Sequence, residues 1–157
     1  LISIQKREFG NGLVLTQGGN FRASLSRDAV KRQLQVFMAG RAGELLFLGD
    51  SEKVSAGSRH DIKQATALAK EMILSHGMST HFGPVDLSQF SHVENDVLVE
   101  VTAWIIEAEN NAKILLEENM RLVLKIVDEL IKREYLETSE IDGLFCESMV
   151  PTKLEAA

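Results

Sequence analysis

One segment with the period of an amphipathic helix constrains the fold of this 157-residue chain more than any other feature. After Arg59, apolar and small residues recur three and four positions apart, which places them on one face of an α-helix. They are Ile62, Ala65, Thr66, Ala69, Met72 and Ile73. Ser58 and Asp61 have the spacing of a capping box at the start of such a helix, and Gly77 suits the left-handed position after its end. The segment therefore predicts a helix with one buried face and with Asp61 at the edge of that face.

Further helices are predicted from the same kind of pattern. They run from a cap at Ser26 to about Leu48, from a Ser91–Glu94 capping box to about Glu118, from a cap at Asn119 onward, and from Thr138 onward. In the same order, the expected apolar faces are as follows. The helix after Ser26 has Val30, Leu34, Phe37, Met38, Leu45 and Leu46, and the helix after Ser91 has Val97, Val101, Trp104, Ile105, Ala108, Ala112, Leu115 and Leu116. The helix after Asn119 has Val123, Leu124, Val127, Leu130 and Ile131, and the helix from Thr138 has Ile141 and Leu144. Because short joints favour antiparallel packing, we expect the helices after Ser91 to form a self-supporting bundle.

The first fifteen residues have the pattern of a small β-hairpin. Ile2 and Ile4 alternate with polar residues, and an apolar stretch at 13–15 follows a Gly-Asn-Gly turn that suits a tight hairpin. An isolated hairpin is only marginally stable, so we expect it to pack on the helices. The predicted fold is mainly α, a helical bundle with a small N-terminal β-hairpin in one domain at 1–149, followed by a disordered tail at 150–157.

Two glycines interrupt the helix that starts after Ser26. Gly40 and Gly43 each cost about 1 kcal/mol relative to alanine inside a helix, so we expect close approach of another helix to offset that cost. Between and beside them, Arg41 and Glu44 are three positions apart, a spacing that favours an ion pair.

Composition excludes several classes of function. A net charge of −6 argues against a nucleic-acid partner, and the single cysteine, Cys146, rules out an internal disulfide and fits a reducing compartment. No apolar run approaches the roughly 20 residues that a membrane helix requires. The chain starts at Leu1 without a methionine, so we expect it to be a fragment whose parent carries any membrane anchor elsewhere.

Four short motifs in register identify a family. The chain reads Ser55-Ala56-Gly57-Ser58-Arg59-His60-Asp61, Ala65-Thr66, Gly77-Met78-Ser79 and Gly83-Pro84. This resembles the Ser-x-Gly-Ala-x-x-Asp, Ala-Thr, Gly-Met-Ser and Gly-Pro motifs of the peptidase domain of the FtsH-like membrane-anchored AAA+ zinc proteases. The resemblance extends from about Ile2 to Phe145, with a departure at Lys6-Arg7-Glu8, where the family usually has Pro-Arg-Gly.

The resemblance implies the fold of an FtsH-type zinc metallopeptidase domain, with Asp61 as the third protein ligand of a catalytic zinc. The other two ligands and the general base belong to a His-Glu-x-x-His motif, which this chain lacks and which the family places shortly before the position of Leu1. We therefore expect no catalytic residue in this chain, and neither stoichiometric zinc nor peptidase activity from the fragment alone.

The resemblance also implies partners for the parent protein. It would degrade unfolded or membrane proteins as a homo-hexamer, with ATP bound by a separate ATPase domain, since this chain has no P-loop. A segment outside this chain would anchor it at the cytoplasmic face of the bacterial inner membrane, or at the equivalent organelle membrane.

Other interpretations stay open. From spacing alone, Asp61 is a first-turn carboxylate that interacts with its own helix. The histidines, His60, His76, His81 and His92, have no spacing typical of metal ligands. The chain could belong to a non-catalytic paralogue or a scaffold and oligomerisation module that lacks the metal-binding motif, or it could be a helical interaction module with no enzymatic ancestry. The sequence upstream of Leu1 would separate these possibilities.

Overall fold

The computed structural model describes residues 2–5, 13–14 and 26–149 and confirms a mainly helical fold with a small antiparallel sheet. The elements are β1 Ile2–Ser3, β2 Leu13–Val14, α1 Arg27–Leu48, η2 Ser51–Lys53, η3 Ala56–Ser58, α2 Arg59–Ser75, η4 Leu87–Gln89, α3 Glu94–Glu118, α4 Met120–Arg133, β3 Tyr135–Leu136 and α5 Thr138–Met149, where η denotes a 3-10 helix. The chain divides into two compact units. We call Phe21–Glu117 the helical unit, and Leu1–Asn20 with Glu118–Ala157 the sheet unit.

Helix α1 begins and ends where the sequence predicts. Ser26 precedes it in an extended conformation, and its side-chain oxygen accepts a hydrogen bond from the Ala29 N–H at 3.2 Å. At the other end, Gly49 adopts a left-handed φ of 64°, and its N–H donates to the Leu45 carbonyl oxygen at 3.1 Å. Both ends thus satisfy backbone groups that a helix terminus would otherwise leave without partners.

The glycines inside α1 do not mark a close approach of another helix. A Cβ atom at Gly40 would meet nothing within 4 Å, and one at Gly43 would meet Leu116 Cδ1 at 3.9 Å, an ordinary contact. The expected tight packing is therefore wrong for the part of the chain that the structure describes, because Gly40 lies on the exposed side of α1. Close approach of a helix from another subunit is not tested by the single chain.

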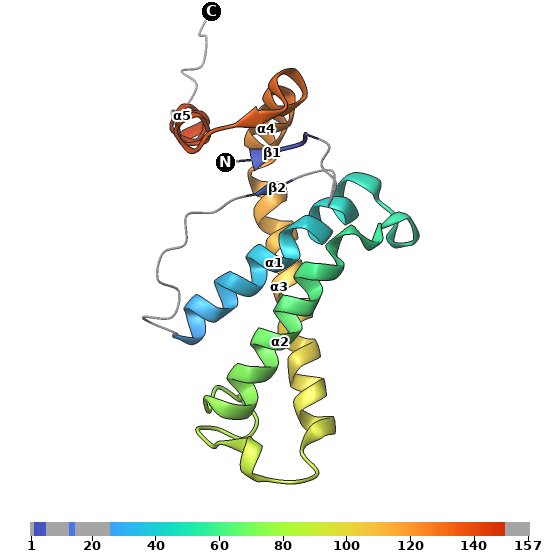
Figure 1. Ribbon diagram of the computed structural model, residues 1–157, viewed down its shortest axis with the longest axis vertical. Helices are drawn as coiled ribbons and strands as arrows, with labels where there is room; N and C mark the ends of the chain where they lie inside the picture. The colour runs from blue at the N-terminus through green and yellow to red at the C-terminus, as the bar shows by residue number, and fades with distance from the viewer. Residues whose placement is uncertain (1, 6–12, 15–25, 150–157) are drawn as a thin grey trace, which may run out of the picture. The chain divides into compact units, whose positions relative to one another are not determined.

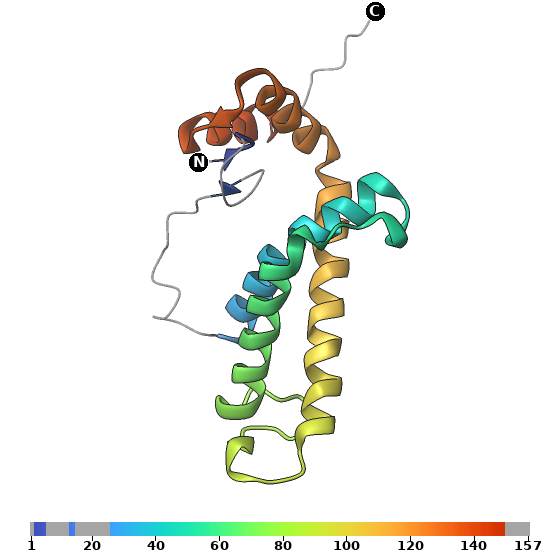
Figure 2. The ribbon, with the colours of Figure 1, turned by 45° about the vertical axis from the view of Figure 1, so that its right-hand side comes forward.

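Helices α2 and α3 run antiparallel in the helical unit, and α1 packs against them (Figures 1 and 2). The buried core draws on all three helices and on η4: Val30, Leu34, Met38, Ala65, Ala69, Met72, Ile73, Leu87, Val97, Val101, Trp104 and Ala108. Most residues of the three predicted faces are among them, and Trp104 is 5% exposed. The 3.6-residue period of the sequence therefore identifies most of the inward faces of these helices, but it is wrong for Thr66 on α2 and for Leu115 on α3, which are exposed.

The predicted start of α3 is two residues early. His92 has a φ of 69°, and the first helical hydrogen bond joins the Val97 N–H to the Val93 carbonyl oxygen. Helix α3 therefore begins at Glu94, and the expected Ser91–Glu94 capping box is wrong, because the positive φ at His92 separates Ser91 from the helix.

The helices after Ser91 do not form a bundle of their own. Helix α3 contributes its core residues to the helical unit, whereas α4 and α5 belong to the sheet unit. In α4 the buried residues are Leu122 and Leu130, while the predicted Leu124 and Ile131 are 47% and 69% exposed. The prediction fails because α4 carries apolar residues around more than half of its circumference, so period alone does not select the buried side.

The sheet unit contains a three-stranded antiparallel sheet in the order β2-β1-β3. Ile2 pairs with Val14 on one side and with Leu136 on the other. The first pairing confirms the predicted hairpin, whose turn lies outside the described residues. The second was missed, since β3 has two residues and gains its conformation from pairing with β1. Leu136 of β3 is buried.

Helix α5 starts at Thr138 as predicted, with Ile141 and Leu144 half-buried and Cys146 exposed. Among the described residues, no helix combines the length and the apolar character needed to cross a membrane. The predicted tail at 150–157 lies outside the described residues.

Candidate functional site

The loop before α2 is held by a glutamate from α1. The Ser55 N–H and hydroxyl donate to Glu44 Oε2 and Oε1, both at 2.7 Å, and the Ser55 hydroxyl oxygen accepts from the Gly57 N–H at 3.1 Å. The Ser55 hydroxyl and then its N–H lower the pKa of the Glu44 carboxyl, against a smaller effect of desolvation. An ionised Glu44 thus fixes η3, which leads directly into α2.

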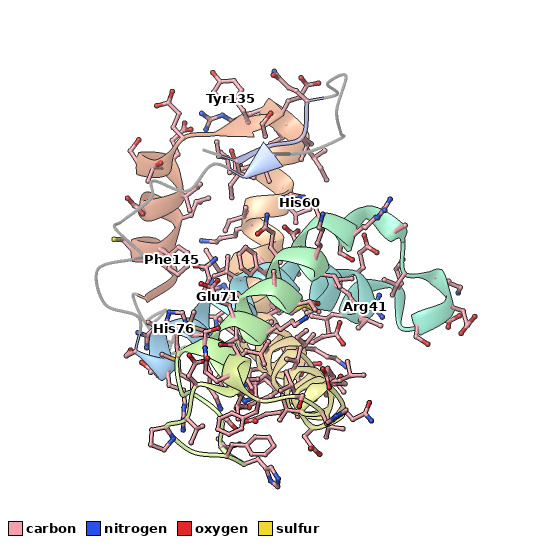
Figure 3. The ribbon with its side chains drawn as sticks, turned by 60° about the horizontal axis from the view of Figure 1, so that its bottom comes forward. Arg41, His60, Glu71, His76, Tyr135 and Phe145 are labelled. Atoms are coloured by element: carbon pink, nitrogen blue, oxygen red, sulfur yellow. The ribbon has the colours of Figure 1, made fainter. Side chains whose placement is uncertain are left out.

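The predicted Arg41–Glu44 ion pair is wrong. Glu44 is occupied by Ser55, and Arg41 instead places its Nε 2.8 Å from Oε1 of Glu109 on α3. The Glu109 Oε1 is buried and accepts no hydrogen bond among the described residues, because the Arg41 Nε–H does not point at it. The contact between Arg41 and Glu109 is therefore an ion pair defined by distance. Arg41 therefore links α1 to α3 within the helical unit, and lies on α1 in Figure 3.

Helix α2 starts without the predicted capping box. Ser58 has φ −78° and ψ 5°, close to helical values, and its side chain makes no capping hydrogen bond. Because η3 runs straight into α2, the capping role moves three residues upstream, where the Ser55 oxygen accepts from Gly57.

Asp61 lies in the first turn of α2, as predicted, and is half-buried. No hydrogen bond or ion pair joins Asp61 to another residue within 2–5, 13–14 or 26–149. The first turn of a helix favours negative charge, so the position suits an ionised carboxylate. The carboxylate is therefore available to a partner that these residues do not include.

The described residues do not by themselves make a metal site. A catalytic zinc needs three protein ligands, and no group of three His, Cys, Asp or Glu side chains comes together in the described part of the chain. Figure 3 shows His60 and His76 at opposite ends of α2. Those two histidines, His81 and His92 are all exposed. Asp61 is thus the one candidate ligand of the sequence that keeps a favourable position, and it has no second ligand beside it here.

A second glutamate holds the other end of α2, and sequence reasoning missed it. Glu100 on α3 accepts hydrogen bonds from the Ser79 hydroxyl at 2.6 Å, the Thr80 N–H at 2.5 Å and the Thr80 hydroxyl at 2.8 Å. Ser79 Oγ also accepts from the N–H groups of His81 and Phe82. The available signal was the position of Glu100, which falls on the same helical face as the apolar core residues of α3.

Glu100 stays ionised although it is buried. Burial alone would raise the pKa of its carboxyl, but the hydrogen bonds from Ser79 and Thr80 together hold the pKa below its ordinary value. These bonds fix the turn after Gly77, whose φ of 62° confirms the left-handed position that the sequence predicts. Both loops that flank α2 are therefore fixed by carboxylates from neighbouring helices.

Comparison with known proteins agrees with this arrangement of motifs. Residues 2–144 match the model of peptidase family M41. The chain is 34% identical over 141 residues to "ATP-dependent zinc metalloprotease FtsH 1" of Symbiobacterium thermophilum. The matched segment covers 88% of this chain and 23% of that relative. It is 33% identical over 142 residues to an FtsH of Neorickettsia risticii, covering 85% and 22%. An FtsH 4 of Sorangium cellulosum is 30% identical over 141 residues, covering 78% and 21%. The chain thus spans less than a quarter of the length of these curated relatives.

Proposed function

The chain belongs to peptidase family M41, and on that basis we propose that it is part of an ATP-dependent zinc metalloendopeptidase and supplies Asp61 as the third zinc ligand. The observation that carries the proposal is the position of Asp61 within the family match, half-buried in the first turn of α2 with no partner among the described residues. Relatives that match the same span are named as ATP-dependent zinc metalloproteases.

In this proposal the chain's own residues orient one ligand. The Glu44–Ser55 hydrogen bonds fix the loop before α2, and Asp61 lies in the first turn of α2, where the helix favours an ionised carboxylate. Bound zinc would polarise a peptide carbonyl and lower the pKa of a bound water. Two histidines and the glutamate that serves as general base would come from a His-Glu-x-x-His segment upstream of Leu1.

The proposal extends to substrates and assembly. The parent would degrade unfolded or membrane proteins as a homo-hexamer, with ATP hydrolysis in a separate domain and a membrane anchor outside this chain. Support comes from the relatives' names, which include a "chloroplastic/mitochondrial" FtsH of Oryza sativa that is 32% identical over 133 residues and covers 83% of this chain and 17% of the relative. The expected location is the cytoplasmic face of a bacterial inner membrane or the equivalent organelle membrane.

The test is Asp61→Ala in the longer protein that includes the upstream motif. We expect zinc content to fall from about one per chain to a small fraction and casein hydrolysis to be lost, while ATP hydrolysis stays largely intact. Asp96→Ala is the matched control, since Asp96 lies exposed in the first turn of α3. Full proteolysis in the Asp61 variant, or stoichiometric zinc in the 157-residue chain alone, would contradict the proposal.

A second candidate is a non-catalytic paralogue that serves as a scaffold or oligomerisation module. The lack of a second ligand near Asp61 among the described residues fits both candidates, because the first one places the other ligands upstream of Leu1. The family match argues against a helical module with no enzymatic ancestry. The coding sequence upstream of Leu1 decides between the two remaining candidates, because an intact His-Glu-x-x-His supports the peptidase and a degenerate one supports the scaffold.

A further inference from the structure

The outward side of α3 carries a stripe of exposed residues without charge. At 100° per residue, six exposed residues fall within an arc of about 100° on this side. We call them the α3 stripe: Asn95, Val99, Thr102, Ala103, Ile106 and Asn110. Val99 is 71% exposed and Ile106 is 53% exposed. Because 25% of the chain is charged, a charge-free exposed stripe with large apolar side chains has the character of an interface centre.

The α3 stripe reads the same from both ends. Its successive residues are four, three, one, three and four positions apart, and their chemistry runs polar, apolar, small, small, apolar, polar. The Thr102 hydroxyl donates to the Leu98 carbonyl oxygen of its own helix at 2.7 Å, so Thr102 needs no hydrogen-bond partner across an interface. A surface with this symmetry is complementary to a second copy of itself after a two-fold rotation, which is the isologous arrangement.

We propose that the α3 stripe binds the α3 stripe of a second copy of this chain, with the two helices antiparallel and a two-fold axis between Thr102 and Ala103. Val99 of each copy then lies opposite Ile106 of the other, and both apolar pairs leave water. The small residues at the axis let the two helices approach to about 8–10 Å. The contact does not involve Asp61 and goes beyond the proposed function.

The polar residues beyond the apolar pairs are complementary as well. Asn95 lies opposite Asn110 of the second copy, and each amide can both donate and accept a hydrogen bond. Lys113, about one turn past Asn110, comes within two residues of Glu94 of the second copy, or about 3 Å along the helix axis. In the described part of its own chain, Glu94 has no ion pair, and Lys113 reaches Glu117 only at 3.9 Å. Two ion pairs related by symmetry would therefore form at the ends of the contact.

The like charges beside the α3 stripe are already compensated. Asp96 approaches Glu107 of the second copy, but Lys31 lies 2.7 Å from the Glu107 carboxylate within its own chain and offsets its charge. The stripe is about 22 Å long at 1.5 Å per residue. A contact of this length is at the small end of specific interfaces, so we expect a dimer Kd of roughly 10–100 µM. An isologous contact pairs two chains, whereas ring contacts run head to tail, so it is separate from the contacts of the proposed homo-hexamer.

The first experiment is sedimentation equilibrium of the 157-residue chain at concentrations from about 1 to 300 µM, which bracket the expected Kd. We expect a monomer–dimer equilibrium in which Val99→Glu raises Kd by at least roughly tenfold, because it places a carboxylate in the apolar part of the contact. Val36→Glu is the matched control, since Val36 lies on α1 and is 60% exposed, and it should leave Kd unchanged. Circular dichroism checks that both variants stay folded.

The outcomes of this experiment are distinct. A chain that stays monomeric over the whole range would overturn the proposal, and so would equal weakening by Val99→Glu and Val36→Glu. A larger assembly that Val99→Glu leaves intact would show that the copies associate through another surface, and would overturn it as well.

The second experiment tests the antiparallel register. Val99→Cys and Ile106→Cys are made separately with Cys146→Ser, because Cys146 is exposed, and the two proteins are oxidised with copper phenanthroline, mixed and alone. We expect several-fold more disulfide-linked dimer in the mixture, because two copies of the same position lie about 10 Å apart along the helix axis. Equal cross-linking in all three samples, or none in the mixture, would overturn the two-fold contact.

Discussion

Each end of α2 is fixed by a glutamate carboxylate that accepts hydrogen bonds from the adjoining loop, but the two carboxylates differ in how deeply they are buried. At the start, Glu44 of α1 accepts from the Ser55 N–H and hydroxyl; at the end, Glu100 of α3 accepts from the Ser79 hydroxyl and from Thr80. Glu100 is 8% exposed, while Ser55 is exposed and Glu44 half-buried. The end without a candidate ligand is therefore held in the interior, and the end that carries Asp61 is held near the surface.

This difference indicates a division of roles within one helix. Hydrogen bonds to a buried carboxylate cost a great deal to break, because the groups left behind cannot turn to water. Hydrogen bonds near the surface can be replaced by water, so the loop before Asp61 can adjust locally while the rest of the unit stays folded. We expect Glu100 to control global stability and Glu44 to control the local order of the candidate site.

The largest effect should come from Glu100→Ala. The substitution leaves the Thr80 N–H and the Ser79 hydroxyl without their acceptor in a buried site, so we expect a loss of about 2–4 kcal/mol in the free energy of unfolding. Urea denaturation measures it. Glu107→Ala on the same helix is the control, because Glu107 pairs with Lys31 at the surface and should cost less than about 1 kcal/mol. Equal losses of unfolding free energy in the two variants would contradict the inference that the buried hydrogen bonds of Glu100 control global stability.

A somewhat smaller effect should come from Gly77→Ala at the same end of α2. Gly77 has a φ of 62°, and a Cβ atom there would lie 3.0 Å from the Cα of Pro84. Strained backbone and a contact with the main chain together should cost about 2–3 kcal/mol. Gly83→Ala separates the two causes, since Gly83 also has a positive φ, 76°, but nothing lies within 4 Å of its Cβ position. Its loss should be about 1 kcal/mol, from the backbone alone.

Sequence predicted the parts of this structure that local rules control. The ends of α1 follow from Ser26 and Gly49, and the end of α2 follows from Gly77, because each satisfies backbone groups within a few residues. The buried position of Trp104 follows from the helical period. These features need no knowledge of what the helices pack against.

The remaining features depend on partners distant in the chain. Strand β3 exists through its pairing with β1, and Glu100 is buried because Ser79 and Thr80, twenty and more residues earlier, meet it. No local pattern names such partners. Asp61 as a metal ligand is a different case, since its helix position follows from the sequence but its proposed role comes from the resemblance to a family motif.

A pH titration should sharpen the comparison without removing any side-chain volume. The pKa of Glu100 is lowered in the folded chain, so its contribution to stability is complete above the ordinary value of 4.5 and is lost as pH falls through the lower folded value. Glu100→Gln lacks this contribution. The difference in unfolding free energy between wild type and Glu100→Gln should therefore shrink as the pH is lowered from 6 to about 3. A difference that stays constant would show that the ionised form of Glu100 is not what the Ser79 and Thr80 hydrogen bonds stabilise.

The smallest global effect and the most local one should come from Glu44→Ala. The Ser55 N–H loses its acceptor directly and the Gly57 N–H loses a fixed Ser55 oxygen, so hydrogen exchange should quicken roughly tenfold at Ser55 and less at Gly57. The free energy of global unfolding should fall far less than with Glu100→Ala, because water can replace the lost carboxylate as the acceptor. Glu52→Ala, at an exposed residue of η2, is the matched control and should leave both amides unchanged. If Glu44→Ala instead destabilised the whole unit as strongly as Glu100→Ala, the two glutamates would contribute equally to global stability. The loop before Asp61 would then not adjust locally while the rest of the unit stays folded.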